Sequence, residues 1–357
     1  MTVTTSYPGI YLSEAASLNF SVTSSATAVP FFLRTRLTGN HLPDSDVYIF
    51  NSWSEFQAIP DISKDTSFLF YNVIKTWFLN GGGKCYLAGA VGLTKIINAY
   101  DDITLVVGAG ATDQTYGEFL TLIEQGYRLF GLFDSKNERI AASDSPDTIM
   151  ADFPNSPDAA VYYPWLTAEW GGNVPPSVAA AVAIAKTDRA RGPWKAPANV
   201  VIDGITPNYP VSEDLQGRFN QGKALNMIRT FPDVGTVVWG ARTLDDSDSW
   251  RYIPVRRLFN MVERDIKTSL NKLVFEPNSQ PTWQRVKAAV DNYLYRLWQQ
   301  GALAGNKESE AWFVEIGKDI TMTEDDIKEG KLIVKIGLAA VRPVEFIILQ
   351  FSQDIAQ

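Results

Sequence analysis

Several kinds of residue and segment are scarce in this chain, and each absence removes a class of function. One cysteine, Cys85, excludes an intramolecular disulfide, and one histidine, His41, excludes a metal site built from clustered histidines. No run reaches the roughly 18 apolar residues of a membrane-spanning helix, so we expect no membrane insertion. The first residues lack the basic and apolar regions of a signal peptide, which predicts synthesis in the cytoplasm without one.

Positive charge is also in short supply. Lys and Arg total 32 against 40 Asp and Glu, a formal net charge of -8. This argues against a nucleic-acid partner, because phosphate contacts need a concentrated excess of basic side chains. What is present is ordinary for a globular protein, with 45% hydrophobic and 20% charged residues. The length of 357 residues exceeds the size at which single cores stop growing, so we expect about two domains.

Strand-like and helix-like segments alternate along most of the chain. This alternation is typical of a sheet covered by helices, so the expected fold class is α/β, followed by an α+β part after the Asp-rich turn at residues 245–249. Residues 207–221 read as irregular. The predicted strands are 28–33, 84–91, 103–107, 127–132, 159–164, 199–203, 225–230, 235–244, 312–316 and 332–338, and the predicted helices are 67–79, 116–125, 255–274 and 280–300.

Both ends of the chain read as strands without a nearby partner. A strand this isolated is marginal alone, and its open edge would be an aggregation hazard in a monomer. We therefore divide the chain into an N-terminal arm (1–24), an α/β domain (25–244), an α+β domain (245–343) and a C-terminal arm (344–357). The side chains expected to form the arm strands are Val3, Tyr7, Ile10, Tyr11 and Leu12 at one end and Glu345, Phe346, Ile347, Ile348, Leu349 and Phe351 at the other.

Two glycine-rich segments approach phosphate-binding motifs without completing them. In the GGGK of residues 81–84, Cys85 replaces the Ser or Thr of a P-loop and Phe78 replaces its first glycine. In the GAGATD of residues 108–113, Asp113 takes the third glycine position of a dinucleotide fingerprint. We therefore expect no cofactor, and a nucleotide-binding enzyme is only a distant alternative.

Other candidate sites are equally incomplete. The acidic clusters at 245–248 and 324–326 lack EF-hand spacing, so no metal is expected, and TEDD at 323–326 reads as a capped helix start. Cys85 lies in a predicted strand, where a buried thiol is commoner than a nucleophile. We expect no catalytic residue. A carbohydrate-binding module could use the ten tryptophans, but core packing is the simpler explanation.

One segment departs from general propensity. Residues 175–199, PPSVAAAVAIAKTDRARGPWKAPAN, join an Ala-rich helix to a Gly-Pro-Trp-Lys-Ala-Pro turn. The segment resembles the central motif of contractile tail sheath proteins. Companion blocks follow the family's order along nearly the whole chain: YPGIYLSE at 7–14, FLNGGGKCYL at 78–87, GTVVWGARTL at 235–244, YIPVRRLF at 252–259 and a last block at 330–350.

The chain is short for that family. Phage sheaths often carry an extra outward domain in the middle, whereas residues 134–158 here are only loop-sized. The compact form is most similar to sheaths of extracellular contractile injection systems of the antifeeding-prophage and Photorhabdus virulence cassette type. A phage or tailocin tail sheath with the same mechanism is the alternative.

The resemblance implies a structural subunit rather than an enzyme. In this family, subunits form stacked hexameric rings around an inner tube, and their terminal arms add strands to a small sheet of neighbouring subunits. Contraction moves the rings as rigid bodies and drives the tube through a target cell envelope, without a nucleotide. The implied partners are further copies of the chain, the inner tube protein, baseplate and sheath-terminating cap proteins, and any sheath paralogues. The resemblance also implies synthesis in a bacterial cytoplasm and assembly into a phage tail-like particle that is released.

A cationic stretch on the two late helices is the candidate tube-contact surface. By pattern alone, both helices are amphipathic with solvated charged faces. In the family, a helix of the C-terminal domain grips the inner tube partly through charge complementarity. The resemblance assigns this role to residues 282–303, with Arg285, Lys287 and Arg296 as contacts. Residues 255–272 are the alternative helix.

Overall fold

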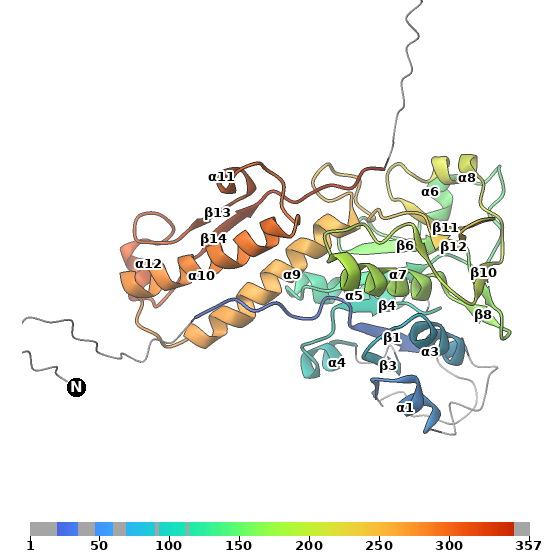
Figure 1. Cartoon of the computed structure of the whole chain (residues 1–357), viewed down its shortest axis with the longest axis horizontal. Helices are drawn as coiled ribbons and strands as arrows, with labels where there is room; N and C mark the ends of the chain where they lie inside the picture. The colour runs from blue at the N-terminus through green and yellow to red at the C-terminus, as the bar shows by residue number, and fades with distance from the viewer. Residues whose placement is uncertain (1–19, 35–46, 60–68, 90–92, 112–113, 346–357) are drawn as a thin grey trace, which may run out of the picture.

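A computed structural model describes residues 20–34, 47–59, 69–89, 93–111 and 114–345. The predicted arm strands therefore lie outside the described residues, with the exception of Glu345, where the described chain ends. The molecule is elongated, with an α/β body at one end and a narrower lobe at the other, joined by a long helix (Figure 1).

A nine-stranded sheet forms the centre of the α/β body, in the order β2-β3-β1-β4-β5-β6-β11-β12-β9. In this order, the pairs between β3 and β11 are all parallel. At the two ends of the sheet, β2 pairs antiparallel with β3, β12 with β11, and β9 with β12. The central strands are apolar on both faces, as expected for a sheet covered by helices. Their bounds are β1 Pro30–Arg34, β2 Tyr48–Phe50, β3 Cys85–Gly89, β4 Leu105–Val107, β5 Phe130–Asp134, β6 Ala159–Tyr163, β9 Val200–Val201, β11 Leu225–Phe231 and β12 Gly235–Val238.

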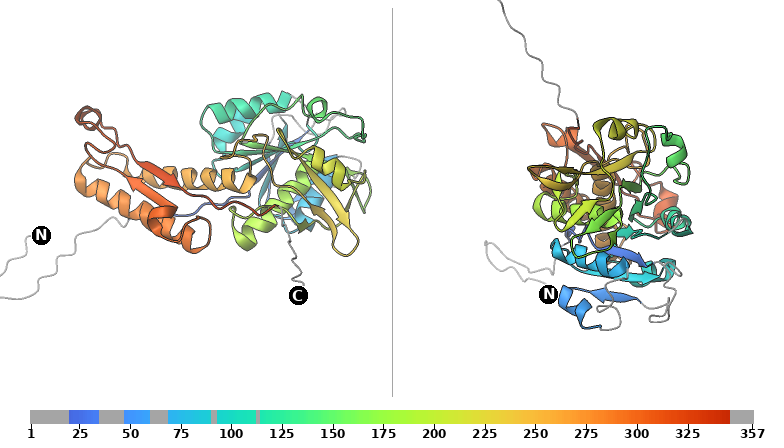
Figure 2. Two further views of the ribbon diagram at one scale, coloured as in Figure 1. Left: turned by 90° about the horizontal axis from the view of Figure 1, so that it is seen from above. Right: turned by 90° about the vertical axis from the view of Figure 1, so that its right-hand side faces the viewer.

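Helices cover both faces of this sheet (Figure 2, left). One face packs against α1 (Trp53–Gln57), α3 (Leu69–Leu79) and α7 (Pro176–Arg191). The other packs against α4 (Leu93–Ala99) and α5 (Gln114–Glu124), with contributions from α6 (Pro146–Ile149) and α8 (Glu213–Arg218). A small sheet in the order β10-β7-β8 adds to the body, with strands β7 Leu166–Ala168, β8 Asn173–Val174 and β10 Ile205–Pro207.

The lobe comprises the elements from α9 to β14 and has its own core. Helix α9 runs from the body into the lobe: its first residue, Ile253, is buried in the body core, and Leu258 and Ile266 are buried in the lobe core. A two-stranded antiparallel sheet, β13-β14, packs beside helix α10. The bounds are α9 Ile253–Leu270, η1 Asn271–Leu273, α10 Gln280–Gln299, α11 Glu308–Ala311, β13 Trp312–Glu315, α12 Glu324–Lys328 and β14 Lys335–Leu338.

Most predicted elements are confirmed, several with shifted ends. Thr323 and Asp326 form the predicted capped start, a complete capping box on α12. Three predictions are wrong, two about where a strand begins or ends and one about an unrecognised helix. The strand predicted over 235–244 ends at Val238, and the one predicted over 332–338 begins only at Lys335. The segment read as irregular contains α8, which Ser212 caps by accepting a hydrogen bond from the Leu215 backbone N–H.

Candidate assembly site

The signature segment forms the central helix of the body. Every residue of α7 from Pro176 to Ala185 is buried, which is why this helix is Ala-rich: small side chains let the sheet and α3 approach closely. The helix ends at Gly192, whose φ of 91° suits glycine, and a Cβ there would lie 2.4 Å from the Trp194 ring. The unusual turn thus has a packing explanation.

Buried ion pairs join α9 to the body, and one of them reaches the end of α7. Arg257 donates two hydrogen bonds to Asp188, of 2.8 and 2.6 Å, and a third of 2.9 Å to the Thr27 carbonyl oxygen. Arg256 pairs with Asp158 at 2.8 Å, again between α9 and the body. The prediction that the charged face of α9 is solvated is therefore wrong for these two arginines. The two arginines are adjacent in α9, but their partners lie 98 and 69 residues away in the sequence.

The first described residues lie along the lobe. Val22 is buried in the lobe core, and its carbonyl accepts a 2.9 Å hydrogen bond from Arg296. The Asp265 carboxylate accepts from the Ser25 backbone N–H at 3.0 Å and from the Tyr293 hydroxyl at 2.7 Å. Burial, together with this carboxylate, raises the pKa of Tyr293, which therefore remains a proton donor. Part of the predicted N-terminal arm is thus held within its own subunit.

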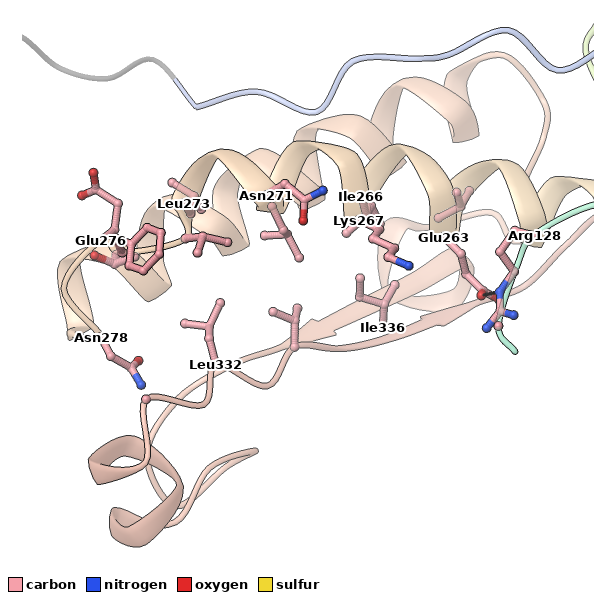
Figure 3. A pocket seen from close by; sticks show the side chains of 18 of the residues that line it. Arg128, Glu263, Ile266, Lys267, Asn271, Leu273, Glu276, Asn278, Leu332 and Ile336 are labelled. Carbon is pink, nitrogen blue, oxygen red and sulfur yellow. Dashed lines mark hydrogen bonds and ion pairs between the residues drawn. The ribbon is translucent and has the colours of Figure 1, made fainter. Parts of the chain in front are cut away.

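An apolar groove of about 800 Å³ separates α9 from β14 (Figure 3). Ile266, Leu270 and Leu273 line one wall, and the half-buried Leu332 and Ile336 line the other. Within the described residues, β14 pairs only with β13. The groove therefore adjoins a strand that has an unpaired edge, which is the arrangement that strand addition requires.

The three predicted tube-contact residues do not share one face of α10. At 100° per residue, Arg285 and Arg296 lie on the same face, and Lys287 lies about opposite them. Arg285 is 42% exposed and lies 3.9 Å from Glu276. Lys287 lines a hollow of about 560 Å³ whose walls include the exposed aromatic side chains Tyr295 and Phe313.

The glycine-rich turns have structural explanations. Gly81, with a φ of 77°, follows the end of α3 as predicted, and its carbonyl accepts a hydrogen bond from Arg189 of the signature helix. Beside the second turn, the Asp134 carboxylate accepts from the backbone N–H groups of Gly110 and Ser177, at 2.8 and 2.7 Å. Ser177 lies in the first turn of α7, so the protein's own carboxylate takes donors that a bound phosphate would need.

Two further expectations concern reactive groups. Cys85 is buried in β3, as predicted, and burial raises the pKa of its thiol, which disfavours the nucleophilic thiolate. Among the described residues, no group of three or more His, Cys, Asp or Glu side chains is arranged to hold a metal ion.

No described helix is both long and apolar enough to cross a membrane.

Solved structures of contractile injection systems resemble this chain over nearly its whole length. A chain of the anti-feeding prophage baseplate in the contracted state is 59% identical, with a TM-score of 0.90, and the match covers 98% of this chain and 100% of that one. A chain of the sheath complex of PVC, an extracellular contractile injection system, in the contracted state is 48% identical, with a TM-score of 0.89 and 99% of each chain covered. The chain belongs to the sheath proteins of extracellular contractile injection systems.

More distant relatives agree with this assignment. Residues 245–354 match the family of the phage tail sheath C-terminal domain. The tail sheath protein of Vibrio phage KVP40 is 27% identical over 123 residues, which are 33% of this chain and 18% of the phage protein. A sheath tail protein from Desulfitobacterium hafniense, 9% identical over 93% of this chain and all of that one, shares the fold with a TM-score of 0.62. This sheath protein is a structural subunit of a contractile sheath, and the predicted resemblance is confirmed.

Proposed function

We propose that this sheath protein polymerises as stacked hexameric rings around an inner tube, and that contraction of the rings drives the tube through a target cell envelope. The observation that carries the proposal is the apolar groove beside β14, a strand that pairs only with β13 among the described residues. A related chain, 42% identical and covered in full, comes from the six-fold symmetrised anti-feeding prophage baseplate. Baseplate, cap and tube proteins are the proposed partners, in a particle that is assembled in the cytoplasm and then released.

The proposed occupants of the groove and edge are the terminal arms of neighbouring subunits. The C-terminal segment VEFIILQF is apolar and rich in β-forming residues, and the N-terminal segment carries Val3, Tyr7, Ile10, Tyr11 and Leu12. Main-chain hydrogen bonds to β14 would supply affinity, and the groove would accept alternate apolar side chains. The four-part division at residues 24, 244 and 343 is part of the same proposal.

Negative-stain electron microscopy tests the proposed addition of arm strands to the β14 edge. The intact chain should form ribbed hollow cylinders, alone or with its inner tube protein, and a chain lacking residues 344–357 should form only small soluble species. Ile336→Asp places a charge in the groove, while Ile333→Asp places the same charge on an exposed side chain nearby. We expect only Ile336→Asp to block assembly. Equal assembly by both variants, with both folded, would contradict the proposed binding of the arms in this groove.

The proposed tube-contact residues remain Arg285, Lys287 and Arg296. Lys287 is the one beside exposed aromatic side chains, and Arg296 already donates to the chain's own backbone. We therefore expect Lys287→Glu to reduce co-assembly with the inner tube more than Arg285→Glu does. Lys328→Glu on the exposed α12 is the matched control. If Arg285→Glu alone abolishes co-assembly, the opposite face of α10 grips the tube.

A place in the ring next to the baseplate is a second candidate within this function. The 59% identical chain comes from a baseplate structure, whereas a chain of the contracted helical sheath is 43% identical. An epitope-tagged copy expressed in its native particle should label a single band at the baseplate. Label along the whole sheath would assign the chain to the main cylinder.

A further inference from the structure

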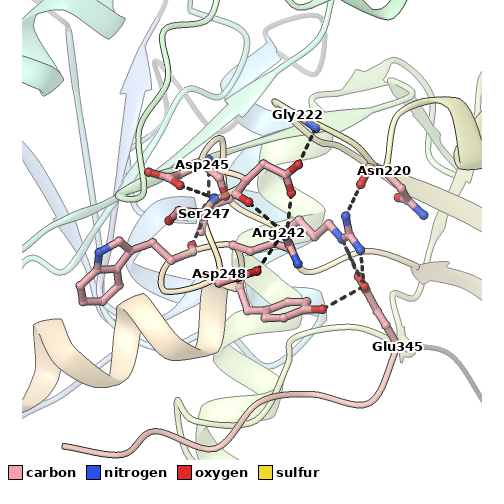
Figure 4. Close-up of polar contacts among 12 residues, drawn as sticks. Asn220, Gly222, Arg242, Asp245, Ser247, Asp248 and Glu345 are labelled. Atoms are coloured by element: carbon pink, nitrogen blue, oxygen red, sulfur yellow. Dashed lines mark hydrogen bonds and ion pairs between the residues drawn. The ribbon is translucent and has the colours of Figure 1, made fainter.

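The end of the described chain is fastened to the α/β body by one carboxylate. After β14 the chain leaves the lobe and returns to the body (Figure 1), where Glu345 meets Arg242 (Figure 4). Arg242 Nε donates to Glu345 Oε1 at 2.9 Å, and its NH2 group donates to Oε2 at 2.6 Å. Tyr252 adds a hydroxyl donor at 3.3 Å. The pair is bidentate, which is the strongest form of this contact.

Arg242 is held in place from several sides. Its backbone N–H donates to Asn226 Oδ1, and its carbonyl accepts from Asn226 Nδ2, each at 2.8 Å. Its guanidinium also donates to the Asn220 carbonyl and lies over the Tyr252 ring. The Arg242 side chain is 10% exposed, and Glu345 is the one carboxylate that pairs with it among the described residues. Arg242 is thus also held by contacts that do not involve Glu345.

We propose that Arg242 is a positioning residue that fixes the origin and direction of the C-terminal arm, a role that rests on the proposed strand exchange. With the pair intact, 12 residues of the chain, 346–357, lie beyond the anchored Glu345 and can span at most about 40 Å. Without it, the next backbone hydrogen bond back along the chain joins Val341 to Ala302 in the lobe. The segment beyond that bond has 16 residues, 342–357, and starts from a different part of the molecule.

A longer arm with a displaced origin reaches its partner less efficiently. The effective concentration of a tethered strand falls when its tether no longer matches the span between the two sites. The Arg242 pair therefore contributes to assembly without touching the neighbouring subunit. This role differs from that of the arm strand itself, whose side chains would enter the neighbour's sheet.

A Glu-specific endoprotease tests the pair in the soluble subunit, independently of assembly. Cleavage after Glu345 needs its side chain free, so the native protein should release the peptide 346–357 slowly. Loss of hydrogen bonds of this strength should raise the fraction of molecules in which Glu345 is released from the body by about tenfold or more. Cleavage after Glu345 should therefore be about tenfold faster or more in Arg242→Ala. Arg242→Lys, which keeps the charge and loses the bidentate geometry, should fall between. Unchanged cleavage in Arg242→Ala would overturn the proposal.

The matched control is Arg251→Ala. Arg251 pairs with Asp246 at 2.7 Å and with Asp248 at 3.4 Å beside the same site, and not with Glu345 among the described contacts, so this variant should leave cleavage after Glu345 unchanged. Acceleration by this control as well would point to general loosening and would refute a specific role. If Arg242→Ala does not fold, the Arg242→Lys comparison decides.

Assembly is the second readout. If the wild-type chain assembles, Glu345→Gln should lower the yield of cylinders while its thermal unfolding stays near that of the wild type. A full yield from Glu345→Gln would refute the positioning role but leave the sheath function intact. If the wild-type chain fails to assemble even with its inner tube, the proposed function fails, and the protease assay still decides whether Arg242 holds the arm.

Discussion

Removing Arg257 should destabilise the protein more than any single surface change. The Arg257 and Asp188 side chains are 3% and 6% exposed, and the pair makes two direct hydrogen bonds. Arg257→Met fills similar space but leaves the Asp188 carboxylate with the Thr27 hydroxyl as its remaining described partner. Breaking a buried pair from one side costs about 3 to 5 kcal/mol, because a charge is left buried without compensation.

The measurement is equilibrium unfolding in urea, followed by tryptophan fluorescence. Arg257→Met should lower the free energy of unfolding by about 3 to 5 kcal/mol and the melting temperature by roughly 5 °C. The double variant Arg257→Met/Asp188→Leu removes both charges and should recover most of this loss. Arg251→Met breaks a pair that is 29% and 37% exposed and should cost less than about 1 kcal/mol.

Two results would refute this reasoning. A loss below about 1 kcal/mol for Arg257→Met would mean that water reaches Asp188 and solvates it. A double variant as unstable as the sum of its single changes would mean that the two side chains act independently. Either result would remove the ion pair as the joint between α7 and α9.

Three further predictions concern single positions. Gly192→Ala forces a side chain into a positive φ and to 2.4 Å from the Trp194 ring, so it should lower the melting temperature, measured by circular dichroism. Burial raises the pKa of Asp134 from 3.8 to about 6, so the folded protein holds this proton more tightly than the unfolded chain does. The free energy of unfolding should therefore fall as the pH rises from about 4 to 6. The fall should be smaller in Asp134→Asn. Cys85 should not react with a thiol reagent in the native protein and should react fully in denaturant, because its thiol is buried and its pKa is raised.

Local sequence patterns predicted those parts of the fold that depend on neighbouring residues. The apolar runs of the central strands, the glycine that follows α3 and the capping box at Thr323 each depend on side chains within a few residues, so the sequence displays them directly. The signature at residues 175–199 carried the resemblance to the family, and close packing explains its Ala-rich helix and its turn at Gly192.

Three of the shortest strands were missed for the opposite reason. Strands β7, β8 and β10 are too short to show a period, and their pairing brings together segments from residues 166 to 207. Strand β9, which lies within the predicted strand 199–203, pairs with β12 across a similar distance in the chain. Such pairings join residues that are far apart in the sequence, so no local pattern records them.

The sequence by itself determined the family, the α/β alternation and the longer helices. Tertiary structure decided which charges are buried and which surfaces are open. Arg257 and Lys287 both read as basic residues on amphipathic helices, yet one is buried against Asp188 and the other lines an exposed hollow. Glu345 reads as part of a strand, yet its carboxylate is bound to Arg242, 103 residues away. The physical reason is that ion pairing and burial depend on distance in space, which folding sets and sequence spacing does not record.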